Sequence, residues 1–196
     1  MTVNDNRSRE IEEWISGYAE RLRKRYSTFL KCLQTCNESP LIVETGTVRH
    51  YQEWESNGQS TYLFGEFVSK FGGKLITVDI NKDAIELSRK VTSKFQDSIE
   101  YVQMDSVEFL MNHKGRIDLL YLDSMDCPTT GNALQSQKHN LAEFIASMGN
   151  LNTGSVVLLD DAEFENGGKT ALTESVMPIA GFECVQKDYQ SLWIKK

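Results

Sequence analysis

The sequence predicts an α/β protein with a doubly wound, mostly parallel sheet of seven strands. Short apolar runs alternate with longer segments of helical periodicity along most of the chain. This alternation is typical of a parallel sheet that is covered by helices on both faces. Each run predicted as a central strand also ends at, or just before, an acidic residue. Because such sheets bind ligands at the carboxyl ends of their strands, the acids indicate a binding site.

Length and charge narrow the class of protein. A chain of 196 residues fits one domain, with residues 1–39 as a helical extension and residues 40–196 as the α/β core. A net charge of −7 and a pI near 5.1 argue against binding to a nucleic acid backbone. No apolar run approaches the ~20 residues that span a bilayer, and the N-terminus lacks the apolar core of a secretory signal. We expect a cytoplasmic protein that binds neither nucleic acid nor membrane.

The N-terminal extension is expected to form one amphipathic helix over residues 8–35. Its apolar residues recur at steps of three and four, Ser8 can cap its start, and Pro40 follows its end. The basic run Arg21 to Arg25 is interpreted as a solvated face of this helix. The apolar stripe is expected to dock on the core. A lid over the ligand and a homodimer face are the alternatives.

The first strand and the loop after it are the centre of the predicted site. Leu41 to Val43 form a buried strand, and Glu44-Thr45-Gly46-Thr47 interrupts it with a charge and a glycine. A helix follows at Tyr62 to Phe71, after Asn57-Gly58-Gln59-Ser60-Thr61. A strand, a glycine loop and a helix N-terminus together suit a nucleotide-like ligand, although a glycine in such a connection can serve the backbone alone.

The other elements follow by the same reasoning. Helices are expected after Asn81, from Ser106 to Met111, from Lys138 to Met148, and before Pro178. The further strands are expected at 74–79, 99–104, 117–123, 154–160, 182–186 and 191–195. The last two form a hairpin that adds one antiparallel strand at an edge of the sheet.

The strand-end acids indicate what the site binds. They are Glu44, Asp79, Asp105, Asp123 and the pair Asp160-Asp161. Asp79 closes the second strand, where an acid can accept both hydroxyls of a ribose. Asp105 or Ser106 is expected near an adenine, although Asp105 can equally cap the next helix.

The phosphate-binding glycine patterns of nucleotide enzymes are absent from the sequence. Neither G-x-G-x-x-G nor G-x-x-x-x-G-K-[ST] occurs, and Glu44 beneath the loop would repel a phosphate. A cofactor with ribose and adenine but no phosphate fits better, and Glu44 offers an acceptor for an ammonium group. S-adenosylmethionine has these features.

The sequence resembles the class I S-adenosylmethionine-dependent methyltransferases over residues 41–196. The segments that carry the resemblance are 43–47, 58–61, 76–80, 117–124, 154–161 and 181–193. Within that superfamily, Asp160-Asp161 resembles the metal-dependent O-methyltransferases of the catechol and macrocin types. The chain departs from the common E-x-G-x-G-x-G pattern by an insertion, Val48 to Asn57. It also has Asp-Asp where the catechol type has Asp-Asn, which is closer to the macrocin type.

The resemblance implies that Asp123, Asp160 and Asp161 hold a divalent cation. Three hard oxygen ligands suit Mg²⁺ or Mn²⁺, which would bind the acceptor hydroxyl and lower its pKa. The alternative is that Asp160-Asp161 caps the segment that follows. His139 is the candidate general base, although a lone histidine in a helix is often structural. Lys169, in Gly167-Gly168-Lys169, could place a cation near the acceptor or merely start a helix.

These observations predict an S-adenosylmethionine-dependent O-methyltransferase that acts on a hydroxyl of a small molecule, with a divalent metal. The residues expected to bind the cofactor are Glu44, Gly46, Thr47, Ser60, Asp79, Ile80, Asp105, Ser106 and Asp123. The catalytic candidates are His139 and Asp123. The loops Val48 to Trp54 and Ser124 to Leu134 are expected to shape the acceptor pocket. The alternatives are a non-catalytic relative and a nicotinamide or nucleotide-sugar enzyme on the same scaffold.

Overall fold

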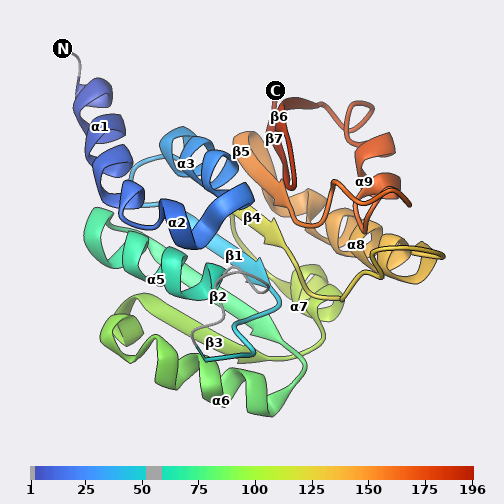
Figure 1. Cartoon of the computed structure of the whole chain (residues 1–196), viewed down its shortest axis with the longest axis horizontal. Coiled ribbons are helices and arrows are strands. Elements are labelled where there is room, and N and C mark those ends of the chain that lie inside the picture. The colour runs from blue at the N-terminus through green and yellow to red at the C-terminus, as the bar shows by residue number, and fades with distance from the viewer. Residues whose placement is uncertain (1–2, 52–58) are drawn as a thin grey trace.

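A computed structural model describes residues 3–51 and 59–196 of the chain. Its seven strands form one sheet in the order β3-β2-β1-β4-β5-β7-β6 (Figure 1). The strands are β1 Leu41–Thr45, β2 Lys74–Asp79, β3 Ile99–Gln103, β4 Ile117–Leu122, β5 Leu151–Leu159, β6 Phe182–Lys187 and β7 Ser191–Lys195. The predicted fold class is confirmed. The order reverses between β1 and β4, and the carboxyl ends of these strands therefore define the switch point where ligands bind.

The C-terminal hairpin differs from its prediction in one respect. The antiparallel strand β7 does not take an edge, because it pairs with β5 on one side and with β6 on the other. The edge belongs to β6. This arrangement brings the turn between β6 and β7 next to the carboxyl end of β5, where Tyr189 accepts a backbone hydrogen bond from Ala162 at 2.8 Å.

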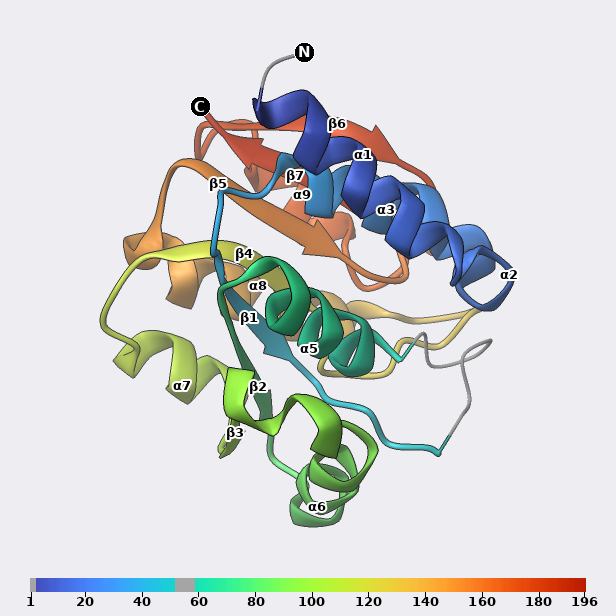
Figure 2. The ribbon, with the colours of Figure 1, turned by 90° about the vertical axis from the view of Figure 1, so that its left-hand side faces the viewer.

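The helices cover both faces of the sheet, as the sequence predicts. They are α1 Val3–Ser16, α2 Ala19–Leu22, η1 Arg23–Arg25, α3 Tyr26–Thr35, α5 Ser60–Phe71, α6 Lys82–Val91, η2 Ser93–Ser98, α7 Ser106–Asn112, α8 Leu134–Ser147, η3 Met148–Asn150 and α9 Ala171–Val176. Figure 2 shows α1 beside α3, with α5 below them, all in front of the strands. Asn81 caps α6, as predicted, by accepting from the backbone of Asp83 and Ala84. Among the described residues, no helix has the length and apolar character needed to cross a membrane.

Two apolar cores sit on opposite faces of the sheet. The first joins α1, α3 and α5 to one face. At its centre lie the rings of Phe29, Phe64 and Tyr121, whose centroids are 5.5–5.8 Å apart. The second joins α7 and α8 to the other face through residues such as Leu110 and Phe144. Both cores are made of side chains that alternate along the strands, which fixes the register of the sheet.

The N-terminal extension docks on the sheet, but it is not the single helix predicted for residues 8–35. It breaks after Ser16 and turns through α2 and η1 before α3 begins at Tyr26. Arg23 takes a positive φ of 48°, which an uninterrupted helix does not allow. Ser8 therefore lies within α1 and caps nothing. Apolar residues continue to recur at steps of three and four across the break, and this spacing is why the sequence predicts one helix.

Candidate active site

The loop after β1 packs directly against the end of β4. Gly46 has a φ of +82°, and a Cβ at this position would lie 2.6 Å from the carbonyl oxygen of Asp123. Only glycine therefore fits here without moving one of the two strands. The Gly46 amide also donates to the carbonyl of Val78 at 2.8 Å, which ties the loop to β2. The backbone of this loop is thus held at the switch point between three strands.

Asp79 ends β2 beside this loop. Its carboxylate accepts from the amide of Thr47 at 3.2 Å and from the amide of Asn81 at 2.8 Å. The side chain is fixed by these two bonds and still lines a cavity of about 390 Å³. Exposed Ile80 lines the same cavity. The arrangement suits an acid that accepts the hydroxyls of a ribose.

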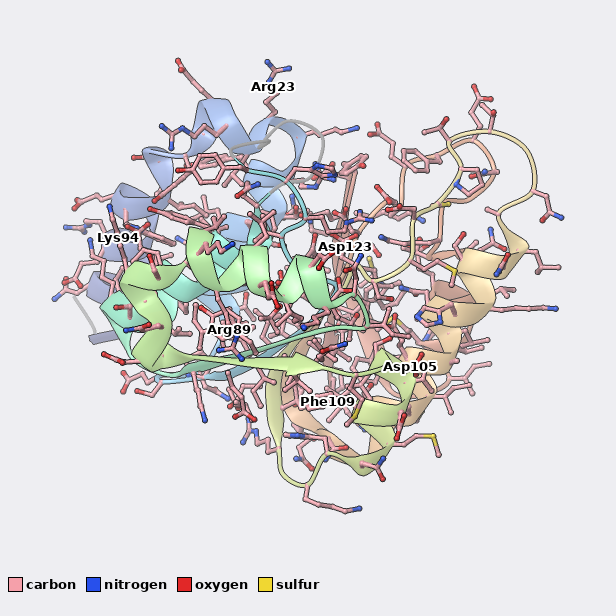
Figure 3. The ribbon with its side chains drawn as sticks, turned by 90° about the horizontal axis from the view of Figure 1, so that it is seen from below. Arg23, Arg89, Lys94, Asp105, Phe109 and Asp123 are labelled. Atoms are coloured by element: carbon pink, nitrogen blue, oxygen red, sulfur yellow. The ribbon has the colours of Figure 1, made fainter. Side chains whose placement is uncertain are left out.

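The other end of this cavity brings together the residues expected near an adenine. Asp105 caps α7 by accepting from the amide of Glu108 at 3.0 Å, and it also lines the cavity with Ser106 and His139. Figure 3 shows Asp105 at the start of α7 and Asp123 after β4, at the same edge of the sheet. Asp105 therefore both caps α7 and lines the cavity, two roles that the sequence left as alternatives. We call this space the cofactor cavity.

His139 lies in the cofactor cavity rather than among the aspartates. Its Nε2 atom is 3.2 Å from the Ser106 hydroxyl, 3.0 Å from the Ser124 hydroxyl and 3.5 Å from Glu143. Contact with Glu143 raises the pKa of His139 above its ordinary value. A histidine whose reactive nitrogen is held by two serines beside the expected adenine is poorly placed to deprotonate an acceptor. The role of His139 as a general base stays a prediction.

Glu44 is buried beneath the loop and lines neither of the cavities described here. Its two oxygens accept from the Ser60 hydroxyl at 2.5 Å and from the Thr77 hydroxyl at 2.7 Å. Burial raises the pKa of Glu44 to about 7, although these hydroxyl donors oppose the shift. The expected direct contact with an ammonium group is not what this geometry offers. Glu44 instead braces the start of α5 against β2.

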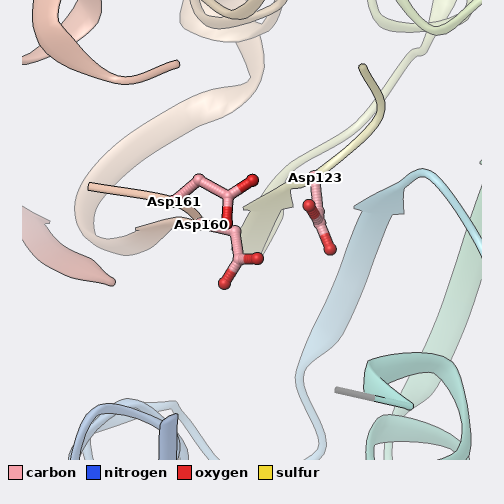
Figure 4. Close-up of side chains that lie close together, drawn as sticks. All are labelled: Asp123, Asp160 and Asp161. Atoms are coloured by element: carbon pink, nitrogen blue, oxygen red, sulfur yellow. The ribbon is translucent and has the colours of Figure 1, made fainter. Parts of the chain in front are cut away.

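The three aspartates predicted as metal ligands do come together. One oxygen from each of Asp123, Asp160 and Asp161 lies within 4.8 Å of the others. Figure 4 shows them gathered at the ends of β4 and β5. We call these three residues the acidic cluster. Asp161 follows the strand with a φ of +55°, a costly conformation for a residue other than glycine.

A buried arginine of the N-terminal extension pairs with the acidic cluster. Arg25 is 4% exposed and donates to both oxygens of Asp160, at 3.1 and 3.0 Å. Burial opposes the charged form of Asp160, but Arg25 holds its pKa below the ordinary value. Gln190 adds a hydrogen bond to Asp160 at 2.7 Å. The basic run of residues 21–25 is thus not all solvated, since exposed Arg23 points away from the body of the protein (Figure 3) while Arg25 points inward.

Lys169 supplies a second buried cation. The residue is 2% exposed, and its ammonium donates to Asp123 and lies 3.3 Å from Asp161. Tyr189 donates its hydroxyl to the other oxygen of Asp161. Burial opposes the charge, yet the pairing with Asp123 and Asp161 raises the pKa of Lys169 above its ordinary value.

These contacts decide how well the acidic cluster fits the expected divalent metal. The oxygens are of the right type and close enough to share one ion. However, Arg25 takes both oxygens of Asp160, and the ammonium of Lys169 lies against the other two carboxylates. A cation of the chain itself therefore stands where the ion would bind. The expectation of a metal held by Asp123, Asp160 and Asp161 does not fit this arrangement.

A second, smaller cavity of about 90 Å³ lies beside the acidic cluster, and we call it the acceptor cavity. It is lined by Arg25, Gly46, Thr47, Val48, Arg49, Ser60, Asp123, Asp126, Asp160 and Asp161. It shares Gly46, Arg49 and Asp126 with the cofactor cavity. Arg49 and Asp126 form a two-point ion pair at 2.7 and 3.0 Å, which joins the loop after β1 to the loop after β4.

The described parts of both predicted acceptor loops therefore contribute, through Val48 and Arg49 on one side and Asp126 on the other. Trp54 and the rest of 52–58 lie outside the described residues. The sequence did not predict Arg25 or Tyr189 as part of the site. The only signal for Arg25 is its place in a basic run, and Tyr189 has no signal in the sequence. Lys169 was weighed, and the two glycines before it were the signal.

The strand order, with an antiparallel C-terminal hairpin, is that of the class I S-adenosylmethionine-dependent methyltransferase fold. A family model described as a methyltransferase domain matches residues 55–162, more than half of the chain. The chain therefore belongs to this methyltransferase family, and the protein is a methyltransferase that uses S-adenosylmethionine. This excludes the nicotinamide and nucleotide-sugar alternatives. No protein in the curated set matches the sequence significantly.

Several solved methyltransferases share the fold at low sequence identity. The calicheamicin methyltransferase CalS11 aligns with a TM-score of 0.62 and 14% identity over 93% of this chain and 84% of its own. The N-methyltransferase NodS of Bradyrhizobium japonicum aligns with a TM-score of 0.56 and 16% identity over 90% and 97%. A candidate methyltransferase of Streptococcus mutans, solved in complex with SAH, aligns with a TM-score of 0.60 and 10% identity over 89% and 98%. These likenesses establish the fold and leave the acceptor open.

Proposed function

We propose that the protein methylates a hydroxyl of a small molecule. The observation that carries the proposal is the meeting of two cavities at Gly46, one suited to a nucleoside and the other narrow and lined by charged groups. S-adenosylmethionine would supply an electrophilic methyl group at this junction. Asp79 and Asp105 would hold its ribose and adenine, and the backbone at Gly46 would allow its methionine part to approach the acceptor cavity.

The size of the acceptor cavity supports a small acceptor group. A volume of about 90 Å³ has room for a few atoms, so the acceptor must present its reactive group on a narrow projection. Asp123 offers an acceptor at its wall and Arg25 offers a donor, and both can align a hydroxyl. Most of the catalysis would then come from positioning the oxygen in line with the methyl group.

The charges that line the acceptor cavity do not choose between a hydroxyl and an amine, because two arginines and four aspartates lie there together. The solved relatives include both chemistries, since NodS is an N-methyltransferase and CalS11 is described as a TDP-rhamnose 3'-O-methyltransferase. The second of these descriptions agrees with the proposal.

Calorimetry with S-adenosylmethionine, and with NAD as a control, is the first test. We expect saturable binding of the methyl donor only. A mass-spectrometric screen of hydroxyl and amine compounds should then find methylated products among the hydroxyls. Turnover of amines alone would overturn the choice of acceptor. Cofactor binding without turnover of any hydroxyl compound would count against the proposed acceptor.

A metal-dependent version of the same reaction is the second candidate. Its support is the 4.8 Å grouping of Asp123, Asp160 and Asp161, which could share an ion if Lys169 withdrew. Turnover that disappears with a chelator and returns with Mg²⁺ or Mn²⁺ would favour this version. Turnover that is indifferent to the chelator would exclude it.

A further inference from the structure

The position of Lys169 is built into the backbone around it. Gly168 has a φ of +59°, and a Cβ there would lie 1.7 Å from the carbonyl oxygen of Asp161. The chain that leaves the acidic cluster at Asp161 thus folds back onto itself and returns to the cluster at Lys169. Such a close approach of two backbone segments is possible only with glycine.

The loop before Lys169 is also held from outside. Gln137 on α8 donates to the carbonyls of Asn166 and Gly168, at 3.1 and 2.9 Å. The Asn166 side chain accepts from the Gly168 amide at 3.1 Å. These hydrogen bonds fix the turn before Lys169, and the turn places the lysine side chain at the cluster.

The cluster is balanced by cations of the chain. Arg25 satisfies Asp160, and Lys169 lies between Asp123 and Asp161. A buried ammonium is tolerated only with such partners, and three carboxylates this close are tolerated only with cations among them. A divalent ion entering the cluster would have to displace the ammonium or sit beside it against strong repulsion.

We propose that the Lys169 ammonium takes the place of a divalent cation in the acidic cluster, so that the wild-type enzyme binds no metal there. Removal of the lysine should free Asp123 and Asp161, the two carboxylates that it pairs with, to bind a metal ion. The inference rests on the proposed function only in placing the cluster beside the acceptor. Its test needs neither an acceptor nor turnover.

The test measures Mn²⁺ binding by electron paramagnetic resonance on the full-length protein after treatment with a chelator. Wild type should show no saturable binding, whereas Lys169→Ala should bind one Mn²⁺ per chain. Lys169→Ala combined with Asp123→Asn should lose that binding, which would locate the ion in the cluster. Lys74→Ala serves as the matched control, because Lys74 begins β2, at the opposite end of the strands from the cluster, and pairs with Glu100 at the surface.

Two results would overturn the inference. One is saturable Mn²⁺ binding by the wild type that Asp123→Asn abolishes. The other is a folded Lys169→Ala protein that binds no Mn²⁺. If Lys169→Ala does not fold, Lys169→Met replaces it, because methionine fills the same space without charge. A measurement on the wild type also tests the inference by itself. The melting temperature of the wild type should not change when Mg²⁺ or a chelator is added, and a rise with Mg²⁺ that Asp123→Asn removes would count against the inference.

Discussion

Arg25 and Asp160 form a two-point ion pair across 135 positions of sequence, and both side chains are buried. The pair fastens the N-terminal extension to the carboxyl end of β5. It also gives the extension a place in the site. Arg25 lines the acceptor cavity together with Asp123 and Asp161.

Replacing Arg25 should destabilise the protein strongly. Arg25→Met leaves Asp160 buried without its cation, which costs about 3–5 kcal/mol in the free energy of unfolding. Arg23→Met should stay within about 0.5 kcal/mol, because Arg23 is exposed. Urea unfolding of both variants measures the difference. Adding Asp160→Asn to Arg25→Met should recover part of the loss, and no recovery would contradict the pairing as its cause.

Glu44 should make stability fall as pH rises. In the unfolded chain its carboxyl ionises near its ordinary pKa of 4.5, whereas in the folded protein burial raises the pKa to about 7. Between these values the native state keeps a proton that the unfolded state has released, so rising pH favours unfolding. The loss is on the order of 3 kcal/mol across this window and is complete above it.

Urea unfolding of wild type and Glu44→Gln between pH 4 and 8 tests this expectation. The glutamine variant should lack the decline, so that its stability relative to wild type rises with pH. Glu100→Gln is the control, because Glu100 is an exposed carboxylate that pairs with Lys74. Parallel profiles for wild type and Glu44→Gln would show that Glu44 is ionised in the folded protein.

Gly46→Ala should damage cofactor binding. The new Cβ would meet the Asp123 carbonyl at 2.6 Å while the backbone is held at a positive φ. Relieving the clash must separate the loop from β4 at the junction of the two cavities. Calorimetry should show at least a roughly tenfold loss of affinity for S-adenosylmethionine, or about 1.4 kcal/mol. Gly149→Ala should bind normally, because no atom lies within 4 Å of its added Cβ.

Asp79→Asn should weaken cofactor binding without unfolding the protein. One amide oxygen must replace a carboxylate that accepts from Thr47 and Asn81 and also faces the cofactor cavity. We expect a roughly 10- to 100-fold loss of affinity for S-adenosylmethionine by calorimetry. Asp83→Asn, in the first turn of α6, is the matched control. Equal losses in the two variants would remove the case for Asp79 as a ribose ligand.

The contact between Glu143 and His139 should be visible in a histidine titration. Glu143 raises the pKa of His139, so Glu143→Gln should lower the pKa of His139. In that variant the His139 imidazole should lose its proton at a lower pH than in the wild type. The pair stabilises the fold below the ordinary histidine pKa, and that contribution disappears as pH rises through the raised value. NMR titration of His139 measures the change, and His113, whose pKa is lowered by burial, serves as an internal reference. An unchanged His139 would mean that the serines, rather than Glu143, set its charge.

The elements of the fold could be predicted because their signals are local. The strand at Ile117 to Asp123 and the cap at Asn81 depend on residues within a few positions of one another. Parallel strands also end at one edge, so the order of elements placed the strand-end acids together, and the family resemblance singled out Asp123, Asp160 and Asp161 among them. The placement of β7 inside the sheet could not be read from the hairpin, because either strand of a hairpin can pair with β5.

The charges that balance the site could not be predicted in the same way. Arg25 meets Asp160 across 135 positions and Lys169 meets Asp123 across 46. No periodicity links residues so far apart, and each lysine or arginine of a helix is most often solvated. His139 differs from these two residues. Its place near the site was right, but α8 points its ring toward Ser106 rather than toward the aspartates.

The segment that this chain shares with its family, residues 55–162, contains all three aspartates of the acidic cluster but neither Arg25 nor Lys169. The acids thus belong to the shared module, whereas their counter-charges come from the sequence on either side of it. A chain trimmed to the shared module would carry a strongly anionic site with nothing from its flanks to neutralise it. If Lys169 takes the place of the ion as proposed, dependence on an added cation is decided by the flanks of this module, and the acids alone are a poor guide to it.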